Sequence, residues 1–271
     1  MVRQRDMEDA LRFTGKTVVI TGGASGIGLA AAHKFAAEGA EVAIIDLRSE
    51  AAADAAASIT ASGGKAFGLG GDVSDIGQVE ANVDAVLDRC GKIDVLFNNA
   101  GLAMHRKADD FGIDEWRRMI AVNLDGIFFW ARTVGRRTMI PRQSGVIINT
   151  ASMAGLAGIP NDIAYVAAKH GVVGITKALA VEWGGYGLRV NCLCPGITET
   201  EMVRAVSEEN PALFADRKRR VPMGRPATPD EQAESVLFMA SDAASYINGL
   251  ILNNDGGQLA LFSGYSLQTN G

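Results

Sequence analysis

Short apolar segments alternate with longer, alanine-rich segments of helical periodicity over the first two thirds of the chain. Strands are predicted at residues 16–21, 41–46, 65–69, 93–97, 146–150, 188–193 and 250–252. Helices are predicted at residues 26–38, 49–62, 75–90, 114–139, 161–184 and 228–241, and residues 201–220 look helical but polar and irregular. The strands are apolar on both faces, which is typical of a parallel sheet covered by helices on both sides.

This pattern predicts an α/β fold with one parallel sheet of about seven strands and right-handed crossovers. The 271 residues contain neither an internal repeat nor a low-complexity linker. We therefore expect an N-terminal extension over residues 1–13 and a single domain over residues 14–271. Ligands bind such open sheets outside the carboxyl ends of the strands, so functional residues are expected at that edge.

The charge pattern does not indicate a nucleic-acid partner. The formal net charge is −5 at pH 7, and the one dense basic run, residues 217–220, is interpreted as a solvated helix face. The sequence has no apolar run of about 18 residues or more, and its N-terminus lacks the apolar segment of a secretory signal. These features predict a cytoplasmic protein without a membrane partner.

The chain contains three cysteines, Cys90, Cys192 and Cys194. An odd number argues against a disulfide framework. Cys192 and Cys194 lie in an apolar predicted strand and are interpreted as buried thiols, so no metal site is expected.

A glycine-rich turn follows the first predicted strand. The segment TGGASGIG at residues 21–28 stands between a strand and a helix, the context that a phosphate-binding turn requires. Glycines let the backbone approach a pyrophosphate, and the first amides of the helix face its negative charge. The segment therefore predicts dinucleotide contacts by Gly22, Ser25, Gly26, Ile27 and Gly28.

An acidic residue ends the second predicted strand, where Asp46 follows Gly28 by 18 residues. Its carboxylate could accept hydrogen bonds from the adenosine ribose and would repel a 2′-phosphate, which favours NAD over NADP. The neighbouring Leu47 is predicted to line the same site. Arg48 is the main alternative, because its guanidinium could turn toward a phosphate.

Two further strand ends carry candidate cofactor contacts. After the third strand, Asp72 and Val73 could hold the edge and the face of the adenine. After the fourth strand comes the segment NNAG, residues 98–101. Its asparagines suit a structural role at the end of the strand as well as direct cofactor contact, and the two interpretations stay open.

Tyr165 and Lys169 are four residues apart in a helical pattern and project from one face. A cation beside the phenol would lower its pKa and allow Tyr165 to act as a general acid or base. Ser152 follows the fifth strand, where its hydroxyl could bind the substrate oxygen. The Tyr–Lys spacing by itself is common on helix surfaces.

Taken together, these motifs resemble the classical short-chain dehydrogenase/reductase family in order and spacing. The resemblance covers residues from about 13 to 259 and rests on TGGASGIG, NNAG, Asn123, Ser152, Tyr165-x-x-x-Lys169 and Pro195–Gly196, with support from Asp72–Val73 and residues 255–257. It implies a doubly wound, Rossmann-type sheet and a homotetramer.

The resemblance also implies residue roles. Tyr165 would be the acid/base, and Lys169 would lower its pKa and bind the nicotinamide ribose. Ser152 would orient the substrate oxygen, and Asn123 would hold a water in a proton relay. Further cofactor contacts would come from Asn99, Ala100, Gly101, Val122, Tyr165, Lys169, Pro195, Gly196, Ile197 and Thr198. Thr200 remains an alternative to Thr198 near the nicotinamide carboxamide.

Residues 197–226 are expected to close over the substrate, and Ser152, Met153, Tyr165 and Met202 are the predicted substrate contacts. Met104, Ile159, Asn161 and Val203 are further candidates. His105 and Arg106 are interpreted as exposed surface residues.

The leading hypothesis is an NAD(H)-dependent oxidoreductase that interconverts a secondary alcohol and its ketone by hydride transfer. The chain as a whole, with an aspartate at position 46, resembles polyol, sugar and cyclic-alcohol dehydrogenases. An NADPH-dependent 3-oxoacyl-thioester reductase is the alternative among enzymes. A catalytically silent dinucleotide-binding regulator and an oligomeric scaffold are the alternatives of other classes, and the intact Ser152, Tyr165 and Lys169 argue against the regulator.

Overall fold

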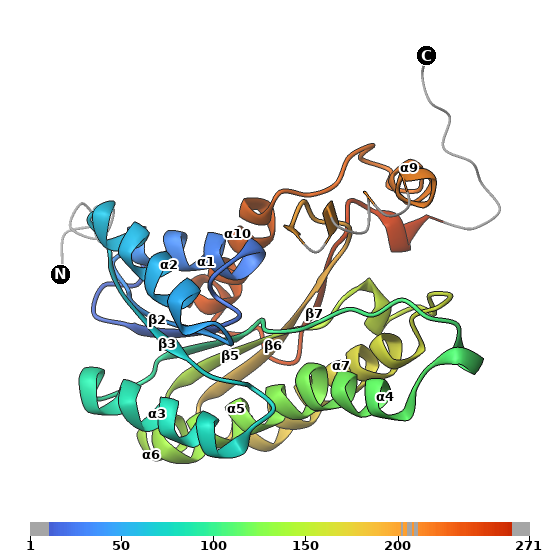
Figure 1. Cartoon of the computed structure of the whole chain (residues 1–271). Helices are drawn as coiled ribbons and strands as arrows, with labels where there is room; N and C mark the ends of the chain where they lie inside the picture. The colour runs from blue at the N-terminus through green and yellow to red at the C-terminus, as the bar shows by residue number, and fades with distance from the viewer. Residues whose placement is uncertain (1–10, 202, 205–207, 209–210, 262–271) are drawn as a thin grey trace.

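One seven-stranded parallel sheet forms the centre of the molecule (Figure 1). The computed structural model describes residues 11–201, 203–204, 208 and 211–261. The strands run in the order β3-β2-β1-β4-β5-β6-β7, and every neighbouring pair is parallel. Their bounds are β1 (Thr17–Thr21), β2 (Glu41–Asp46), β3 (Lys65–Gly70), β4 (Val95–Asn98), β5 (Gly145–Thr150), β6 (Leu188–Pro195) and β7 (Ile251–Asn254). The doubly wound sheet of seven strands that the sequence predicts is confirmed.

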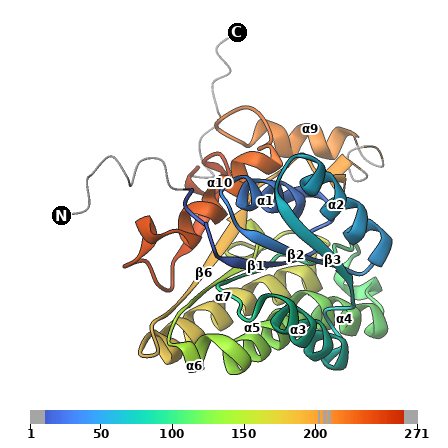
Figure 2. The ribbon, with the colours of Figure 1, turned by 90° about the vertical axis from the view of Figure 1, so that its left-hand side faces the viewer.

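Helices cover both faces of this sheet (Figures 1 and 2). One face carries α1 (Gly26–Ala37), α2 (Ser49–Ala61) and α10 (Pro229–Ala240). The opposite face carries α3 (Ile76–Cys90), α4 (Ile113–Ile120), α5 (Gly126–Val134), α6 (Ile140–Arg142) and α7 (Ile163–Gly184). The short helix α9 (Pro211–Arg219) lies away from both layers, beyond the carboxyl ends of β6 and β7 (Figure 1).

The core consists of two apolar layers, one on each side of the sheet. Successive residues of β1 enter different layers, because side chains alternate along a strand: Ile20 joins Phe35 of α1, and Val19 joins Trp130 of α5. Burial on both faces accounts for the continuous apolar strands of the sequence. Phe13, which the sequence analysis places in the extension, belongs to this core and stacks edge-on against Phe35 at 4.8 Å.

The predicted helix 114–139 is one continuous helix from Ile113 to Arg142, but two π-helical turns interrupt its α-helical geometry. The first comprises Ala121–Asp125 and the second Gly135–Met139. Asn123 lies within the first, where its side-chain amide donates to the carbonyl oxygen of Met119 at 3.2 Å. Turns of this kind are frequent at functional sites, and this one directs Asn123 toward the end of β4.

Local geometry sets the starts of helices α7 and α10. Helix α7 begins at Ile163, two residues later than expected, because Asn161 has a left-handed φ of 65°. Helix α10 begins as predicted: Thr228 Oγ1 accepts from the amide of Glu231 at 3.2 Å, and Pro229 is the first helical residue.

The cysteines and the basic run lie as the sequence indicates. Cys192 and Cys194 are fully buried, and both project toward α7 in one apolar cluster with Val172. In the basic run, Arg219 and Arg220 form exposed ion pairs with Asp216 within the same region. Among the described residues, no helix combines the length and the apolarity needed to cross a membrane.

Candidate active site

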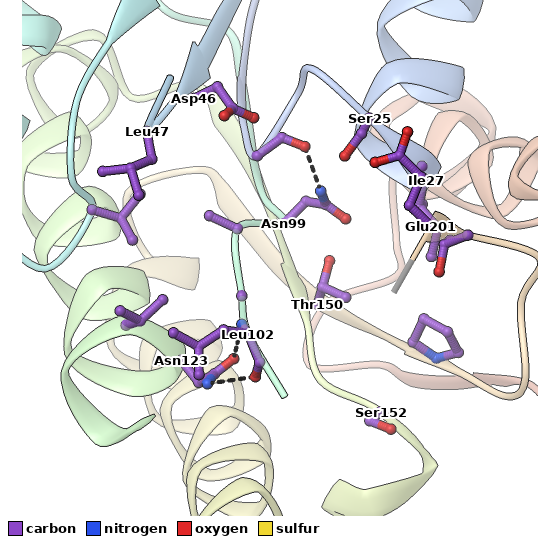
Figure 3. A pocket seen from close by; sticks show the side chains of 18 of the residues that line it. Ser25, Ile27, Asp46, Leu47, Asn99, Leu102, Asn123, Thr150, Ser152 and Glu201 are labelled. Carbon is purple, nitrogen blue, oxygen red and sulfur yellow. Dashed lines mark hydrogen bonds between the residues drawn. The ribbon is translucent and has the colours of Figure 1, made fainter. Parts of the chain in front are cut away.

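The strand order reverses between β1 and β4, and a cavity of about 520 Å³ opens at the carboxyl ends of the strands there (Figure 3). Ligands of open α/β sheets bind at such switch points. Segments from β1, β2, β4, β5, β6 and the start of α7 contribute to the walls. The structure thus brings residues from most of the chain to one edge of the sheet.

The glycine turn forms one wall of this cavity, and it depends on close backbone contacts. Gly22 has a φ of 60°, and a Cβ there would lie 2.8 Å from the Cα of Ala100. A Cβ on Gly28 would lie 2.2 Å from the carbonyl oxygen of Gly22. Ser25, Gly26 and Ile27 line the cavity where α1 begins, whereas Gly28 lies behind the turn and lets it pack. The first amides of α1 have no partner within the helix and are suited to an anion.

Side chains at the end of β4 hold the turn in place. Thr21 Oγ1 accepts from the amides of Asn99 at 3.0 Å and Ala100 at 3.1 Å. The Asn99 side chain donates to the carbonyl of Gly22 at 3.0 Å. Asn98 is buried and donates to Asn149 on β5 at 3.0 Å. Both asparagines therefore have structural roles, and Asn99, Ala100 and Gly101 also line the cavity.

Asp46 and Arg48 lie together at the end of β2. Asp46 accepts from the amide of Ala24 at 3.4 Å through Oδ2 and from the amide of Arg48 at 3.2 Å through Oδ1. The Arg48 side chain is 68% exposed, with its Nε 3.9 Å from the carboxylate. Asp46 and Leu47 line the same end of the cavity (Figure 3), and Arg48 lines the cavity beside Asp46.

Asp72 and Val73 line the cavity after β3, beside an arginine. Asp72 accepts from the amide of Ser74 at 2.9 Å and from its hydroxyl at 2.6 Å. Arg118 of α4 lies 3.5 Å away. Burial opposes ionisation of Asp72, but these hydrogen bonds and the guanidinium outweigh it, and the pKa of Asp72 is lowered.

Ser152, Tyr165 and Lys169 lie together at the other end of the cavity. The Lys169 ammonium is buried, donates to the carbonyl of Thr150 at 2.8 Å and lies 5.5 Å from the centre of the Tyr165 ring. Burial lowers the pKa of Lys169 to about 8.

Tyr165 itself has a raised pKa, contrary to the lowered value that the sequence analysis expects. Burial of the phenol is the main cause, the nearby Asp162 and Cys194 add to it, and the hydrogen bond with Ser152 opposes it. Lys169 is not among these causes. The physical reason is that burial acts on both members of the pair, while the ammonium is hydrogen bonded to Thr150.

Asn123 approaches the same end from the π-helical turn. Its Oδ1 accepts from the amide of Leu102 at 3.2 Å, and its Nδ2 donates to the carbonyl of Leu102 at 3.0 Å (Figure 3). A Cβ on Gly101 would lie 2.7 Å from Asn123 Oδ1 and 3.6 Å from Lys169 Nζ. The glycine at position 101 therefore lets Asn123 and Lys169 approach the end of β4.

The carboxyl end of β6 closes the cavity with Pro195, Gly196 and Thr198. A Cβ on Gly196 would lie 2.6 Å from the Cα of Asp255, so the segment after β7 packs closely against this turn. Thr198 is buried and donates to the carbonyl of Gly196 at 3.2 Å. Thr200 also lines the cavity, with its methyl carbon 3.1 Å from where Gly26 would carry a Cβ.

Most of the predicted site residues line this one cavity. The exceptions are Gly28, Ile197 and Met153, which lie outside its lining, and Met202, which lies outside the described residues. Of the further substrate candidates, Val203 lines the cavity, and Met104, Ile159 and Asn161 do not. The lining also includes residues that the sequence analysis does not name: Gly71, Leu102, Arg118, Thr150, Ala151 and Glu201. Arg118 precedes Val122 by four residues, so helical spacing could have placed it on the same face.

Comparisons with known proteins agree with this architecture. A family model described as enoyl-(acyl carrier protein) reductase matches residues 22–258. A D-threitol dehydrogenase of Mycolicibacterium smegmatis is 42% identical over 248 residues, which cover 91% of this chain and 94% of that protein. The chain is a member of the classical short-chain dehydrogenase/reductase family. It is therefore an oxidoreductase that acts on CH–OH groups with a nicotinamide dinucleotide.

Two solved structures of the family show the same fold. The crystal structure of levodione reductase has a TM-score of 0.87 and 39% sequence identity, covering 93% of this chain and all of that chain (100%). A gluconate 5-dehydrogenase from Burkholderia cenocepacia, in complex with NADP and tartrate, has a TM-score of 0.88 and 38% identity, covering 94% of this chain and 99% of that one. The single-domain, Rossmann-type fold of this short-chain dehydrogenase/reductase is thereby confirmed.

Proposed function

We propose that this member of the family is an NAD(H)-dependent dehydrogenase of a polyol, sugar or cyclic secondary alcohol, with Tyr165 as its acid/base. The observation that supports this proposal is the convergence of Ser152, Tyr165 and Lys169 at one end of the cavity whose other walls include the glycine turn. A silent regulator has no chemical need for this convergence.

The chain fits a dinucleotide on observations independent of the family. The turn at Gly22 and Gly28 is so close-packed that side chains are excluded, and Ser25, Gly26 and Ile27, where α1 begins, line the cavity. The first amides of a helix are suited to binding an anion. A bound nicotinamide ring supplies the acceptor or donor of the hydride. In the proposed mechanism, Ser25, Gly26 and Ile27 would hold the pyrophosphate, and Lys169 would hold the nicotinamide ribose.

The protein's own residues manage the proton. In alcohol oxidation, Ser152 orients the substrate hydroxyl and Tyr165 accepts its proton. In ketone reduction, Tyr165 donates the proton to the forming alkoxide. Alkaline pH favours the deprotonated phenol and hence oxidation, and burial, which raises the pKa of Tyr165, moves this dependence to higher pH. Asn123, hydrogen bonded to Leu102 and close to Gly101, holds the water through which Lys169 exchanges its proton.

The preference for NAD follows from Asp46. Its carboxylate offers several acceptor sites, of which the amides of Ala24 and Arg48 use two, so it retains acceptor capacity for the ribose hydroxyls. A 2′-phosphate at this position would meet the carboxylate, although Arg48 stands beside it. The related gluconate 5-dehydrogenase holds NADP. The preference of this chain for NAD is therefore to be tested by measuring turnover with both dinucleotides.

The names of the relatives, threitol dehydrogenase and levodione reductase, favour small oxygenated substrates. A 3-oxoacyl-(acyl-carrier-protein) reductase of Chlamydia trachomatis, 39% identical over 247 residues, keeps the 3-oxoacyl-thioester alternative open to test. Turnover of a panel of polyols, sugars, cyclic alcohols and hydroxy acids, with NAD⁺ and NADP⁺ in parallel, tests the proposal through absorbance at the nicotinamide band. Reduction of a 3-oxoacyl thioester with NADPH, without turnover of any alcohol, would refute it.

We further propose a homotetramer and a substrate cover formed by residues 197–226, with Met153 and Met202 at the substrate. Exposed apolar side chains on α5 and α7, Phe128 at 42% and Val181 at 83%, support the assembly. Light scattering of the purified protein measures its mass, and a monomer would refute the tetramer.

A further inference from the structure

The helix that carries Tyr165 begins at an unusual N-cap. Asp162 is the N-cap of α7, but its carboxylate makes no cap hydrogen bond to the helix, although aspartate at this position usually does. The carboxylate is instead hydrogen bonded to Nδ1 of His105, and its side chain is only 5% exposed. A buried carboxylate requires a partner, and His105 is the partner that the structure provides.

Backbone contacts join the same two segments. Arg106 and Asp162 form a parallel bridge, and the amide of Arg106 donates to the carbonyl of Asn161 at 2.8 Å. The left-handed φ of Asn161 turns the chain immediately before this contact. On the other side, the Arg106 guanidinium lies 3.0 Å from Glu115 of α4. The connection between β4 and α4, whose course Figure 1 shows, is therefore attached to the start of α7 and to α4.

This contact lies next to the proposed acid/base. Asp162 precedes Tyr165 by three residues, which places both on one side of the first turn of α7. The groups that act on the phenol are Ser152, Cys194 and Asp162, with Lys169 Nζ 5.5 Å from its ring, and Asp162 is the carboxylate among them, which raises the pKa of Tyr165. His105 does not line the cavity, so any effect it has on turnover passes through Asp162 and the connection.

We propose that His105 and Asp162 form a latch that fixes the β4–α4 connection against the start of α7 and positions Tyr165 for the substrate. Both are positioning residues. The connection begins at Leu102, which lines the cavity and is hydrogen bonded to Asn123, so the latch joins two parts of the proposed site. This inference rests on the proposed function where it concerns turnover, and its structural part is testable without turnover.

Amide hydrogen exchange tests the structural part. His105→Ala removes the donor to Asp162 and is expected to speed exchange at residues 102–107. His105→Asn keeps an N–H donor near the position of Nδ1 and is expected to restore most of the protection. His33→Ala is the matched control. His33 is also hydrogen bonded, with its Nε2 3.2 Å from Ser58 Oγ, but it lies between α1 and α2, outside the latch. Unchanged amide exchange in His105→Ala would overturn the latch, regardless of the substrate that the enzyme oxidises.

Kinetics test the positioning of Tyr165. His105→Ala should lower kcat/KM for the alcohol about tenfold and leave dinucleotide affinity within about twofold, since a small displacement of a reacting group is costly. Asp162→Asn keeps the shape of the side chain and removes its charge. It is expected to shift the pH profile of oxidation toward lower pH by about half a unit, because a negative charge near the phenol is lost. A purely structural contact would leave the pH profile unmoved.

The outcomes separate the two proposals. A wild-type protein that binds dinucleotide but oxidises no alcohol, with faster exchange in His105→Ala, would refute the proposed function and retain the latch. A wild-type protein with alcohol turnover, and variants that match it in exchange, kcat/KM and pH profile, would refute the latch alone. If His105→Ala does not fold, Asp162→Asn takes its place as the disrupting variant, and His105→Asn remains the variant that keeps the donor.

Discussion

The two ends of the cavity are built in different ways. At the cofactor end, the decisive feature is the absence of side chains: Gly22 and Gly28 permit backbone contacts that a Cβ would prevent. At the substrate end, the decisive feature is burial of polar groups, namely Lys169, Asn123 and Asp162. The first arrangement lies within eight consecutive residues, whereas the second joins groups far apart in the sequence. The glycine turn can therefore be recognised from consecutive residues, although it packs against Ala100, whereas the catalytic groups can be brought together only by tertiary packing.

The largest expected effect comes from removing the proton carrier alone. Tyr165→Phe deletes the phenolic oxygen without changing the ring, so turnover should fall about a thousandfold, in the range of general acid–base contributions. Affinity for NADH should stay within about threefold, because the glycine turn is unaffected. Steady-state kinetics and fluorescence titration measure the two quantities. A variant that retains a tenth of wild-type turnover would remove Tyr165 from the mechanism.

A change at the cofactor end should give the opposite result. In Gly28→Ala, the new methyl group would lie 2.2 Å from the carbonyl oxygen of Gly22, so the turn must move. Dinucleotide affinity should fall by at least about tenfold, and about 1–3 kcal/mol of stability should be lost through overpacking. Titration with NADH and thermal unfolding measure these effects.

Gly174→Ala provides the matched control, because this helical glycine of α7 has no heavy atom within 4 Å of an added Cβ. It should bind dinucleotide normally and gain up to about 1 kcal/mol of stability from helix propensity. Equal behaviour of the two variants would mean that the glycine turn does not bind the cofactor.

The sequence analysis is more successful at the cofactor end, for a physical reason. The strands, the glycine turn and Asp46 depend on short-range patterns of apolar and small residues. The π-helical turn at Asn123 depends on Leu102, which is 21 residues away. The contact of His105 with Asp162 spans 57 residues. No local pattern encodes either: His105 is exposed, as the sequence analysis interprets it, but its hydrogen bond to Asp162 could not be predicted.

The raised pKa of Tyr165 illustrates the same limit. Helical spacing correctly places the phenol and Lys169 on one face of α7, but the sign of the pKa change depends on how far the cavity removes both groups from water. Burial, Asp162 at the N-cap of α7 and Cys194 of β6 raise this pKa, and the hydrogen bond with Ser152, which follows β5, lowers it. The four-residue spacing therefore predicts that Lys169 lies beside Tyr165, but the direction in which the pKa of Tyr165 shifts depends on the tertiary structure.

A smaller effect is expected from the charge at the end of β2. Asp46→Ala should raise the ratio of kcat/KM for NADP⁺ to that for NAD⁺ by roughly tenfold, equivalent to about 1.4 kcal/mol, because it removes like-charge repulsion and frees Arg48 for a phosphate. Parallel kinetics with both dinucleotides measure this ratio. An unchanged ratio would show that Asp46 does not contact the adenosine ribose.

The last prediction concerns stability, and it compares the free-energy cost of burying Lys169 with the role of Lys169 in catalysis. The pKa of Lys169 is about 8 in the folded protein, against 10.5 for an exposed lysine. Between these two pH values the unfolded chain binds more protons than the folded one, so stability should rise as the pH increases through this window. At pH 7 the buried ammonium is therefore a cost, of the order of 3 kcal/mol before its hydrogen bond to Thr150 is counted.

Lys169→Met removes this cost and keeps most of the side-chain volume. The variant should lose most of its turnover and yet unfold a few degrees higher than the wild type at pH 7, with the difference vanishing near pH 10. Thermal unfolding across this pH range measures both curves. A variant that is less stable than the wild type at pH 7 would show that the hydrogen bond of the ammonium to Thr150 outweighs its desolvation. The substrate end would then resemble the cofactor end, with its functional groups adding to stability.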